Sequence, residues 1–260
     1  MILGEPQRTQ FDLNFQLLGI PVRISPFFWL IALILGQALA GNPTLLLIWI
    51  VVLFMSILLH EFGHALAFRY FGIHSHVVLY HLGGLAVPDD VSSTFRTGRS
   101  LDSRSHIIVS AAGPGAQLLL SVIIILLVQT AGHAVPFPLP FLEQLLPVHG
   151  GDPIPVMSLR FLVQSLLFVN ILWALVNLMP IYPLDGGQIA RELFLLYGGG
   201  QGIKYSLVLS ILTGAGLAIY GLRSGHIFLA IMFGMLAYSS YTTLQAYTGR
   251  GGGFGGGRPW

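Results

Sequence analysis

The chain has 260 residues, of which 54% are hydrophobic and 8% are charged, and its mean hydropathy is +0.78. Soluble domains carry about 25% charged residues, so this composition excludes a typical water-soluble protein and predicts one that crosses a membrane several times. A net charge of +2 does not suggest nucleic-acid binding, and a chain without cysteine has neither disulfides nor thiolate metal sites.

The first predicted element is a strand at the membrane surface, because apolar and polar residues alternate between positions 11 and 25. Six apolar runs have about the 20 residues that a helical span needs. These runs are residues 25–41, 44–69, 106–131, 159–180, 203–221 and 226–246. The sequence therefore predicts an all-α polytopic membrane protein with about six transmembrane helices and a small membrane-associated β element.

Residues 73–88 follow the second run and belong to that β element. They are too few and too interrupted by glycine to cross a bilayer, so we expect a hairpin or a re-entrant pair of strands. The chain length favours a single membrane-embedded domain over residues 1–248. The composition of residues 249–260 predicts a flexible Gly-rich tail.

The positive charges orient this topology. Six spans place both termini on one side, and ten of the twelve Arg and Lys residues fall on that side, with Arg160 and Arg223 as the exceptions. Short cytoplasmic segments carry the excess of Arg and Lys in membrane proteins. We therefore expect a multi-pass protein of the cell membrane whose termini and active-site opening are cytoplasmic.

The second predicted span contains the sequence HEFGH. His60 and His64 are four residues apart and project from one face of a helix, where two imidazoles can bind a zinc ion and Glu61 can reach its water. Each ionisable group costs about 3 kcal/mol at the bilayer centre, so three within five residues require an offsetting interaction, and a metal is the simplest one. His60 lies about 14 Å along the helix from Arg69, a depth that water can reach through a cytoplasmic cleft.

Asp185 is the candidate for a third ligand, because a catalytic zinc site has three protein ligands and one open position. It follows the fourth span in the sequence NLMPIYPLDGG and, in the orientation above, reaches the same side and a similar depth as His60. Pro180 and Pro183 end the helix, and the glycine pair after Asp185 permits close approach to a neighbour. A proline–glycine turn with a capping aspartate is the alternative interpretation.

These motifs together resemble the site-2 protease family of intramembrane zinc metalloproteases. The resemblance rests on HEFGH and on the later N-x-x-P-x-x-P-L-D-G-G, and it extends to GIPVRISP, HLGGLA and SAAGPGAQ. It is closest to the compact branch without PDZ or CBS domains, which contains the sporulation sigma-factor processing protease. Gln117 departs from the pattern, which has asparagine at that position, and the departure concerns a secondary polar contact.

The resemblance implies one Zn²⁺ per chain, bound by His60, His64 and Asp185. It implies that Glu61 acts as the general base toward a zinc-activated water and later protonates the leaving amine. The expected reaction is hydrolysis of a peptide bond within or near a transmembrane segment of a membrane-protein substrate. The expected partners are therefore that substrate and the lipid bilayer.

Three residues are candidates for substrate binding. Asn177 can donate a hydrogen bond to the oxyanion or to the substrate backbone, although an interhelical hydrogen bond is an equal alternative. Gly83 and Gly84 allow an extended substrate to approach an edge of the predicted hairpin, which is otherwise a re-entrant plug. Proline at position 82 or 85 removes a backbone N–H and should then impair cleavage.

Other polar groups receive structural interpretations. Asn170 and the sequence Gly113-Pro114-Gly115 are expected to support helix packing, and the three histidines of residues 73–88 receive no ligand role. The competing functions are another membrane zinc hydrolase, acting on lipid or prenylated peptides, and a non-catalytic scaffold or transporter. A transporter should have paired, glycine-broken spans in corresponding halves, and no convincing repeat of this kind is present.

Overall fold

The computed structural model describes residues 5–81, 83–89, 101–138 and 150–249. These residues form two compact units. The first contains the described residues up to 89 together with 112–138 and 150–176, and the second contains 101–111 and 177–249. The prediction of one domain over residues 1–248 stays a prediction. The tail predicted for 249–260 lies outside the described residues, apart from Gly249.

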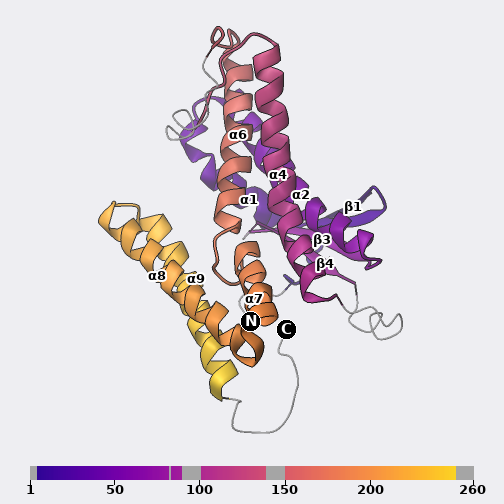
Figure 1. Cartoon of the computed structure of the whole chain (residues 1–260). Helices are drawn as coiled ribbons and strands as arrows, with labels where there is room; N and C mark the ends of the chain where they lie inside the picture. The colour runs from indigo at the N-terminus through magenta and orange to yellow at the C-terminus, as the bar shows by residue number, and fades with distance from the viewer. Residues whose placement is uncertain (1–4, 82, 90–100, 139–149, 250–260) are drawn as a thin grey trace. The chain divides into compact units, whose positions relative to one another are not determined.

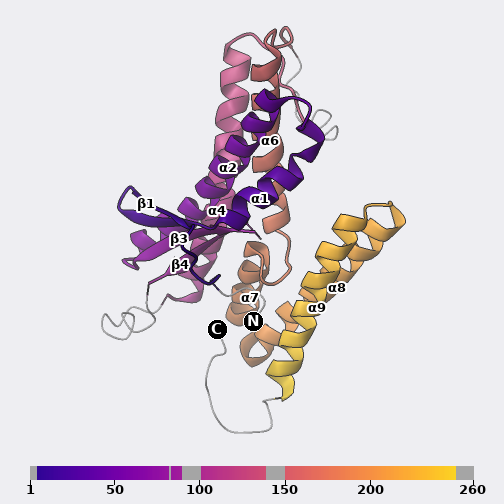
Figure 2. The same ribbon diagram turned by 180° about the vertical axis from the view of Figure 1, so that it is seen from behind.

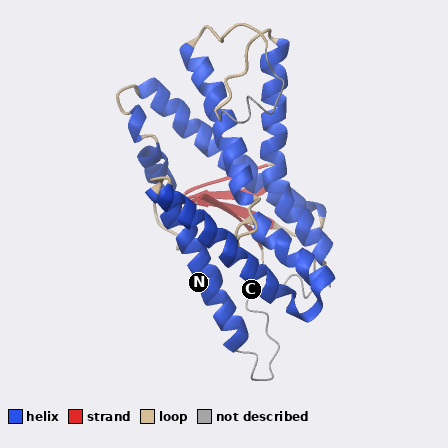
Figure 3. Ribbon diagram, turned by 60° about the vertical axis from the view of Figure 1, so that its left-hand side comes forward, coloured by secondary structure: helices blue, strands red, loops and turns tan. Residues whose placement is uncertain are grey.

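The first unit contains a four-stranded sheet with the order β1-β2-β3-β4, which appears in red in Figure 3. The strands are β1 (Leu13–Leu17), β2 (Ile20–Ile24), β3 (Ser75–Tyr80) and β4 (Gly83–Pro88). The outer pairs are antiparallel and β2 is parallel to β3. Both residues of the turn between β1 and β2, Leu18 and Gly19, have positive φ, as the tightest hairpins require. The 73–88 hairpin is therefore confirmed, and the single strand predicted between residues 11 and 25 is instead a pair of strands, β1 and β2, in the same sheet.

The ladder between β3 and β4 determines which backbone groups face outward. The N–H of Asp89 donates to the carbonyl of His74 (2.8 Å), and hydrogen-bonded pairs then recur at every second residue of the register. Leu85 and Val87 consequently direct their N–H groups toward β3. Gly84 and Ala86 direct theirs toward the outer edge of β4, which is a terminal strand of the described sheet.

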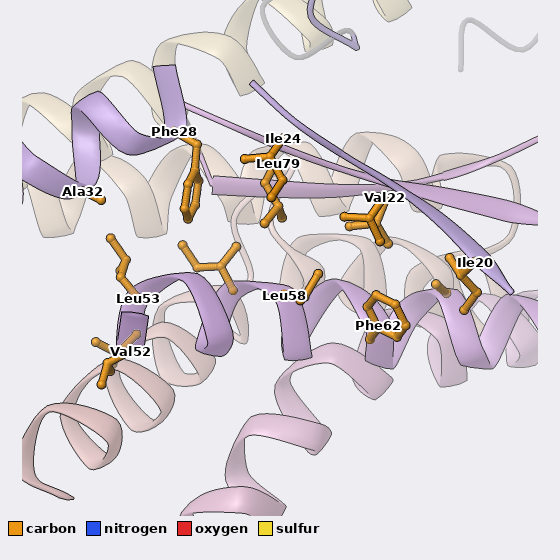
Figure 4. Packing of buried hydrophobic residues seen from close by; sticks show 14 residues of the cluster. Ile20, Val22, Ile24, Phe28, Ala32, Val52, Leu53, Leu58, Phe62 and Leu79 are labelled. Atoms are coloured by element: carbon orange, nitrogen blue, oxygen red, sulfur yellow. The ribbon is translucent and has the colours of Figure 1, made fainter. Parts of the chain in front are cut away.

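One face of the sheet packs against the long helix α2 (Pro43–Tyr70). Figure 4 shows Ile20 and Val22 of the sheet close to Leu58 and Phe62 of α2, and these side chains belong to one buried apolar cluster. The same cluster continues into α1 (Pro26–Leu35) through Phe28. The half of α2 that carries HEFGH therefore lies on the sheet, and its other half packs on α1.

A polar N-terminal segment covers Arg23 on β2. The guanidinium group of Arg23 is buried and binds the carboxylates of Glu5 (2.8 Å) and Asp12 (2.9 Å) and the carbonyl of Pro6 (2.9 Å). A hydrogen bond from the Thr9 hydroxyl, together with Arg23, holds the pKa of Asp12 below its usual value. These bonds attach residues 5–12 to the sheet.

Two more helices complete the first unit. The helices α4 (Ser103–Thr130) and α6 (Met157–Asn177) run side by side in Figures 1 and 2. Ile124 and Val128 of α4 pack with Val163, Leu167 and Ile171 of α6 in a second buried apolar cluster. The first nine residues of α4, up to position 111, fall in the second unit.

The rest of the second unit is helical. It contains α7 (Asp185–Gly198), the 3₁₀ turn η2 (Gly199–Gln201), α8 (Gly202–Arg223) and α9 (Ile227–Gly249). The α8–α9 hairpin is visible in both Figure 1 and Figure 2. Gly221 has no room for a Cβ atom, which would lie 2.8 Å from the backbone nitrogen of Ala230. Small residues thus permit the two backbones to approach closely.

The structure confirms a mostly helical, polytopic architecture with a small β element and refines the number of spans. Five helical segments among the described residues are long and apolar enough to cross a membrane: Pro43–Tyr70, Ser103–Thr130, Met157–Asn177, Asp185–Arg223 and Ile227–Gly249. The run predicted at 25–41 instead forms the ten-residue α1 and the 3₁₀ turn η1 (Gln37–Leu39). Composition did not reveal this difference, because a half-length helix that packs on α2 is as apolar as a full span.

Candidate metal centre

His60 and His64 face each other on α2. Both side chains are buried, and their Nε2 atoms lie 3.1 Å apart. Two nitrogen ligands at 2.0–2.1 Å from a tetrahedral zinc ion are separated by about 3.3 Å. The observed spacing therefore fits two ligands that converge on one ion, and the donor types fit zinc.

Gln117 of α4 holds the other side of the His60 ring. Its Oε1 atom lies 2.9 Å from Nδ1 of His60, and its Nε2 atom donates to the carbonyl of Ser56 (3.2 Å). The amide oxygen is thus the acceptor for an Nδ1–H group, which leaves the Nε2 lone pair of His60 for a metal. Gln117, whose departure from the family pattern was expected to concern only a secondary polar contact, therefore contacts a candidate ligand directly. Its side chain is fully buried.

The same network reaches α6. Asn170 donates from Nδ2 to the hydroxyl of Ser56 (2.9 Å) and to the carbonyl of Leu166 (2.8 Å). Asn170 is fully buried, which agrees with the packing role expected for it. Ser56, Gln117 and Asn170 thus join α2, α4 and α6 beside His60.

Two glycines of the first unit leave space for the candidate site residues. A Cβ atom on Gly113 would overlap the imidazole ring of His64, and one on Gly63 would lie 2.5 Å from the carbonyl oxygen of Ala112. The backbones of α2 and α4 are therefore in direct contact at this level. Gly113, which we expected to have a packing role, also sets the space available to the His64 ring.

Glu61 lies against the hairpin. Its side chain is buried and occupies the space that a Cβ atom of Gly84 would need. Gly84 is also one of the β4 residues whose N–H faces the outer edge of the sheet. The carboxylate of Glu61 is therefore adjacent to a strand edge where an extended peptide can pair.

Asp185 is the first residue of α7 and is buried. The N-cap of α7 is Leu184, without a side-chain cap bond, so Asp185 does not occupy the capping position of the alternative interpretation. His60, His64 and Asp185 are the candidate set of three potential metal ligands among the described residues, with the histidines in the first unit and Asp185 in the second.

The remaining candidates are placed as follows. Gly83 has a φ of +120°, and a Cβ atom there would lie 2.9 Å from the ring of Trp173. Asn177 is half-buried at the end of α6. His76 of the hairpin contacts Asp89 and lies 3.5 Å from Glu5, and it belongs to no metal-binding group of the described residues.

Residues 48–212 match the model of peptidase family M50. The chain belongs to this family. It is 31% identical over 198 residues to a provisionally named zinc metalloprotease of Synechocystis sp., covering 71% of this chain and 44% of that protein. It is 22% identical over 221 residues to a zinc metalloprotease of Methanocaldococcus jannaschii, covering 84% and 56%. The chain thus spans about half the length of these two relatives.

A solved structure shares the fold. The site-2 protease from Methanocaldococcus jannaschii superposes with a TM-score of 0.55 at 20% identity, covering 90% of this chain and 95% of that one. Together with the long apolar helices, the family and the fold identify this M50 chain as a multi-pass membrane protein.

Proposed function

We propose that this chain is an intramembrane zinc metalloprotease, which hydrolyses a peptide bond within or near a transmembrane segment of a membrane-protein substrate. One observation carries the proposal: the buried imidazoles of His60 and His64 converge at 3.1 Å within an apolar 28-residue helix. Membership of family M50 and the zinc metalloprotease relatives support it and do not favour a scaffold or transporter.

In this proposal His60, His64 and Asp185 bind one zinc ion. Zinc supplies Lewis-acid chemistry: it lowers the pKa of a water molecule toward neutrality and polarises the scissile carbonyl. Glu61, as the general base, takes a proton from the attacking water and later delivers it to the leaving amine. The hydrogen bond from His60 Nδ1–H to Gln117 keeps the imidazole in the tautomer that presents Nε2.

The substrate is proposed to add to β4 as an extended strand. A transmembrane helix shields its own peptide bonds, so it must unwind locally before hydrolysis, and pairing with a strand edge compensates for the lost hydrogen bonds. The outward backbone groups of Gly84 and Ala86 supply such an edge, and Gly84 abuts Glu61. Asn177 is retained as a proposed substrate contact on the strength of the sequence pattern alone.

A cytoplasmic location of both termini and of the active-site opening also remains a proposal. It requires an even number of crossings, whereas five helical segments of the described residues qualify as spans. The proposal therefore rests on the ten-to-two distribution of Arg and Lys, and it requires the run 25–41, where α1 lies, to make the sixth crossing.

The decisive experiment measures zinc content and cleavage of a single-span membrane protein by the purified chain in parallel. We expect one zinc per chain in the parent. Glu61→Gln should retain that zinc and lose cleavage, because it removes the proposed base without removing a ligand. A Glu61→Gln variant that still cleaves at the parental rate would disprove the mechanism.

A separate experiment tests the substrate route. Ala86→Pro removes an outward N–H of β4, so we expect cleavage to fall at least about tenfold while zinc content is unchanged. The sequence suggested proline at 82 or 85 instead, but Leu82 lies outside the described residues and the N–H of Leu85 faces β3. Ala86→Gly, which keeps the N–H, is the control. Parental cleavage by a folded Ala86→Pro variant would remove β4 from the proposal.

A further inference from the structure

Residues 178–184 join α6 to α7 and lead directly into Asp185. Pro180 and Pro183 have no N–H to donate in this segment. Two short-range bonds stabilise its turns: Ile181 N–H to the carbonyl of Met179 (2.7 Å), and Leu184 N–H to the carbonyl of Ile181 (2.8 Å). The backbone of Tyr182 lies between these two bonds and is hydrogen-bonded to residues outside the segment.

Tyr182 is bound at both of its backbone polar groups by serine hydroxyls from two helices. Its N–H donates to Oγ of Ser210 on α8 (3.0 Å). Its carbonyl accepts from Oγ of Ser240 on α9 (3.1 Å). Both serines are buried, with side chains almost or completely inaccessible to solvent.

The two hydroxyls are not equivalent. Ser210 donates its own proton to the carbonyl of Ser206 (2.8 Å), which turns an oxygen lone pair toward the N–H of Tyr182. Ser240 has one proton and lies 3.0 Å from the carbonyl of Leu236 as well as 3.1 Å from that of Tyr182. The lone pair of Ser210 is used for Tyr182 alone, whereas the proton of Ser240 is shared between two carbonyls. Removing the Ser210 hydroxyl should therefore displace the Tyr182 backbone more than removing the Ser240 hydroxyl.

Tyr182 is packed directly against the start of α7. A Cβ atom on Gly187 would overlap the backbone of Ile181 and Tyr182, and one on Gly186 would overlap the carbonyls of Leu178 and Met179. Ile181 is completely buried. Backbone atoms contact backbone atoms here, and no flexible side chain lies between them that could change its rotamer. A displacement of Tyr182 must therefore move the first turn of α7, which begins with Asp185.

We propose that Ser210 and Ser240 are positioning residues for Asp185: α8 and α9 hold the peptide of Tyr182 and thereby set where the aspartate carboxylate lies. This inference rests on the proposed function, in which Asp185 is a metal ligand. Neither serine touches the substrate or the metal. Each acts through the backbone of residues 182–187.

The test uses Co²⁺ as the probe, with the full-length protein in detergent or lipid. Its visible absorption reports ligand geometry, and competition with a chelator gives its dissociation constant. Supporting groups of metal ligands are typically worth 10- to 100-fold in affinity. We expect Ser210→Ala to weaken Co²⁺ binding by roughly tenfold and to alter the spectrum, and Ser240→Ala to do so to a smaller extent.

Matched variants separate positioning from folding. Ser206 is equally buried on α8, but its hydroxyl donates only to Ile203 of its own helix, so Ser206→Ala should leave the affinity and the spectrum unchanged. Ser210→Thr and Ser210→Val have the same shape, and only the threonine keeps the hydroxyl. Threonine should therefore bind Co²⁺ more tightly than valine even if both lower the thermal stability.

Two failures are distinguishable. If Asp185→Ala retains parental Co²⁺ binding, Asp185 is not a ligand, and the inference falls with that part of the proposed function. If Asp185→Ala loses the metal but Ser210→Ala and Ser210→Val keep the parental affinity and spectrum, the proposed function stands and the positioning role is wrong.

Discussion

His60 and His64 lie in the second half of a 28-residue helix, whereas Asp185 is the first residue of a 14-residue helix that follows a segment with two prolines. The histidines are constrained through their side chains, because Gln117 binds one ring and Gly113 lies against the other. Asp185 is preceded by a backbone that Ser210 and Ser240 bind. One region is set by side-chain contacts and the other by contacts to the main chain.

This difference has a physical cause. A long helix satisfies its own backbone groups, so its neighbours can contribute only side-chain contacts and close packing. A proline-containing turn within an apolar environment leaves peptide groups that other helices must satisfy. We therefore expect the histidine half of the site to be most sensitive to added volume, and the aspartate half to be most sensitive to lost hydroxyls.

Among substitutions of residues that support the candidate ligands, the largest effect on zinc binding is expected from Gly113→Ala. The new methyl group would occupy the position of the His64 ring, and forcing such overlap typically costs about 1–3 kcal/mol, which corresponds to roughly 5- to 150-fold weaker zinc binding. Zinc content after dialysis against a chelator measures it. Gly115→Ala is the control two residues along the same helix, because no atom of the described residues lies within 4 Å of a Cβ atom there.

The contrast between these two variants is informative in either direction. Equal zinc retention by Gly113→Ala and Gly115→Ala would mean that the histidine half tolerates added volume and that the comparison above is wrong. Loss of zinc in both would point to a general sensitivity of α4, since no described residue stands in the way of a methyl group at position 115.

The sequence predicted the parts of this site that depend on local periodicity. The four-residue spacing of HEFGH implies a shared helix face wherever a helix forms, and five of the six predicted apolar runs correspond to long helices. The hairpin at 73–88 was predictable from its length and its glycines. The family motif singled out Asp185 before any geometry was known.

Contacts between distant residues could not be predicted in the same way. Gln117 lies 57 positions from His60, and only the packing of α4 on α2 brings the amide to the ring. The sequence predicted that the glycine pair of the hairpin admits substrate, but it did not predict the contact of Gly84 with Glu61. Ser210 and Ser240 carried no signal at all, because serines in apolar helices commonly bond their own backbone and both also do so here.

A smaller effect than that of Gly113→Ala is expected from substitutions of Gln117, and it most sharpens the comparison. If the amide orients His60 only by accepting its Nδ1–H, then Gln117→Met, which keeps the length but offers no such acceptor, should weaken zinc binding by about tenfold. Gln117→Glu retains an acceptor oxygen and should bind zinc more tightly than the methionine variant. Chelator competition at several pH values measures both.

The pH dependence separates orientation from packing. A carboxylate at position 117 favours the protonated Nδ1 and raises the basicity of the metal-facing nitrogen, so the gap between Glu and Met variants should depend on pH. A pure packing role would give both variants the same loss at every pH, since their volumes are similar. That outcome would mean that Gln117 only packs between α2 and α4 and that the helix α2 alone determines the orientation of the His60 ring.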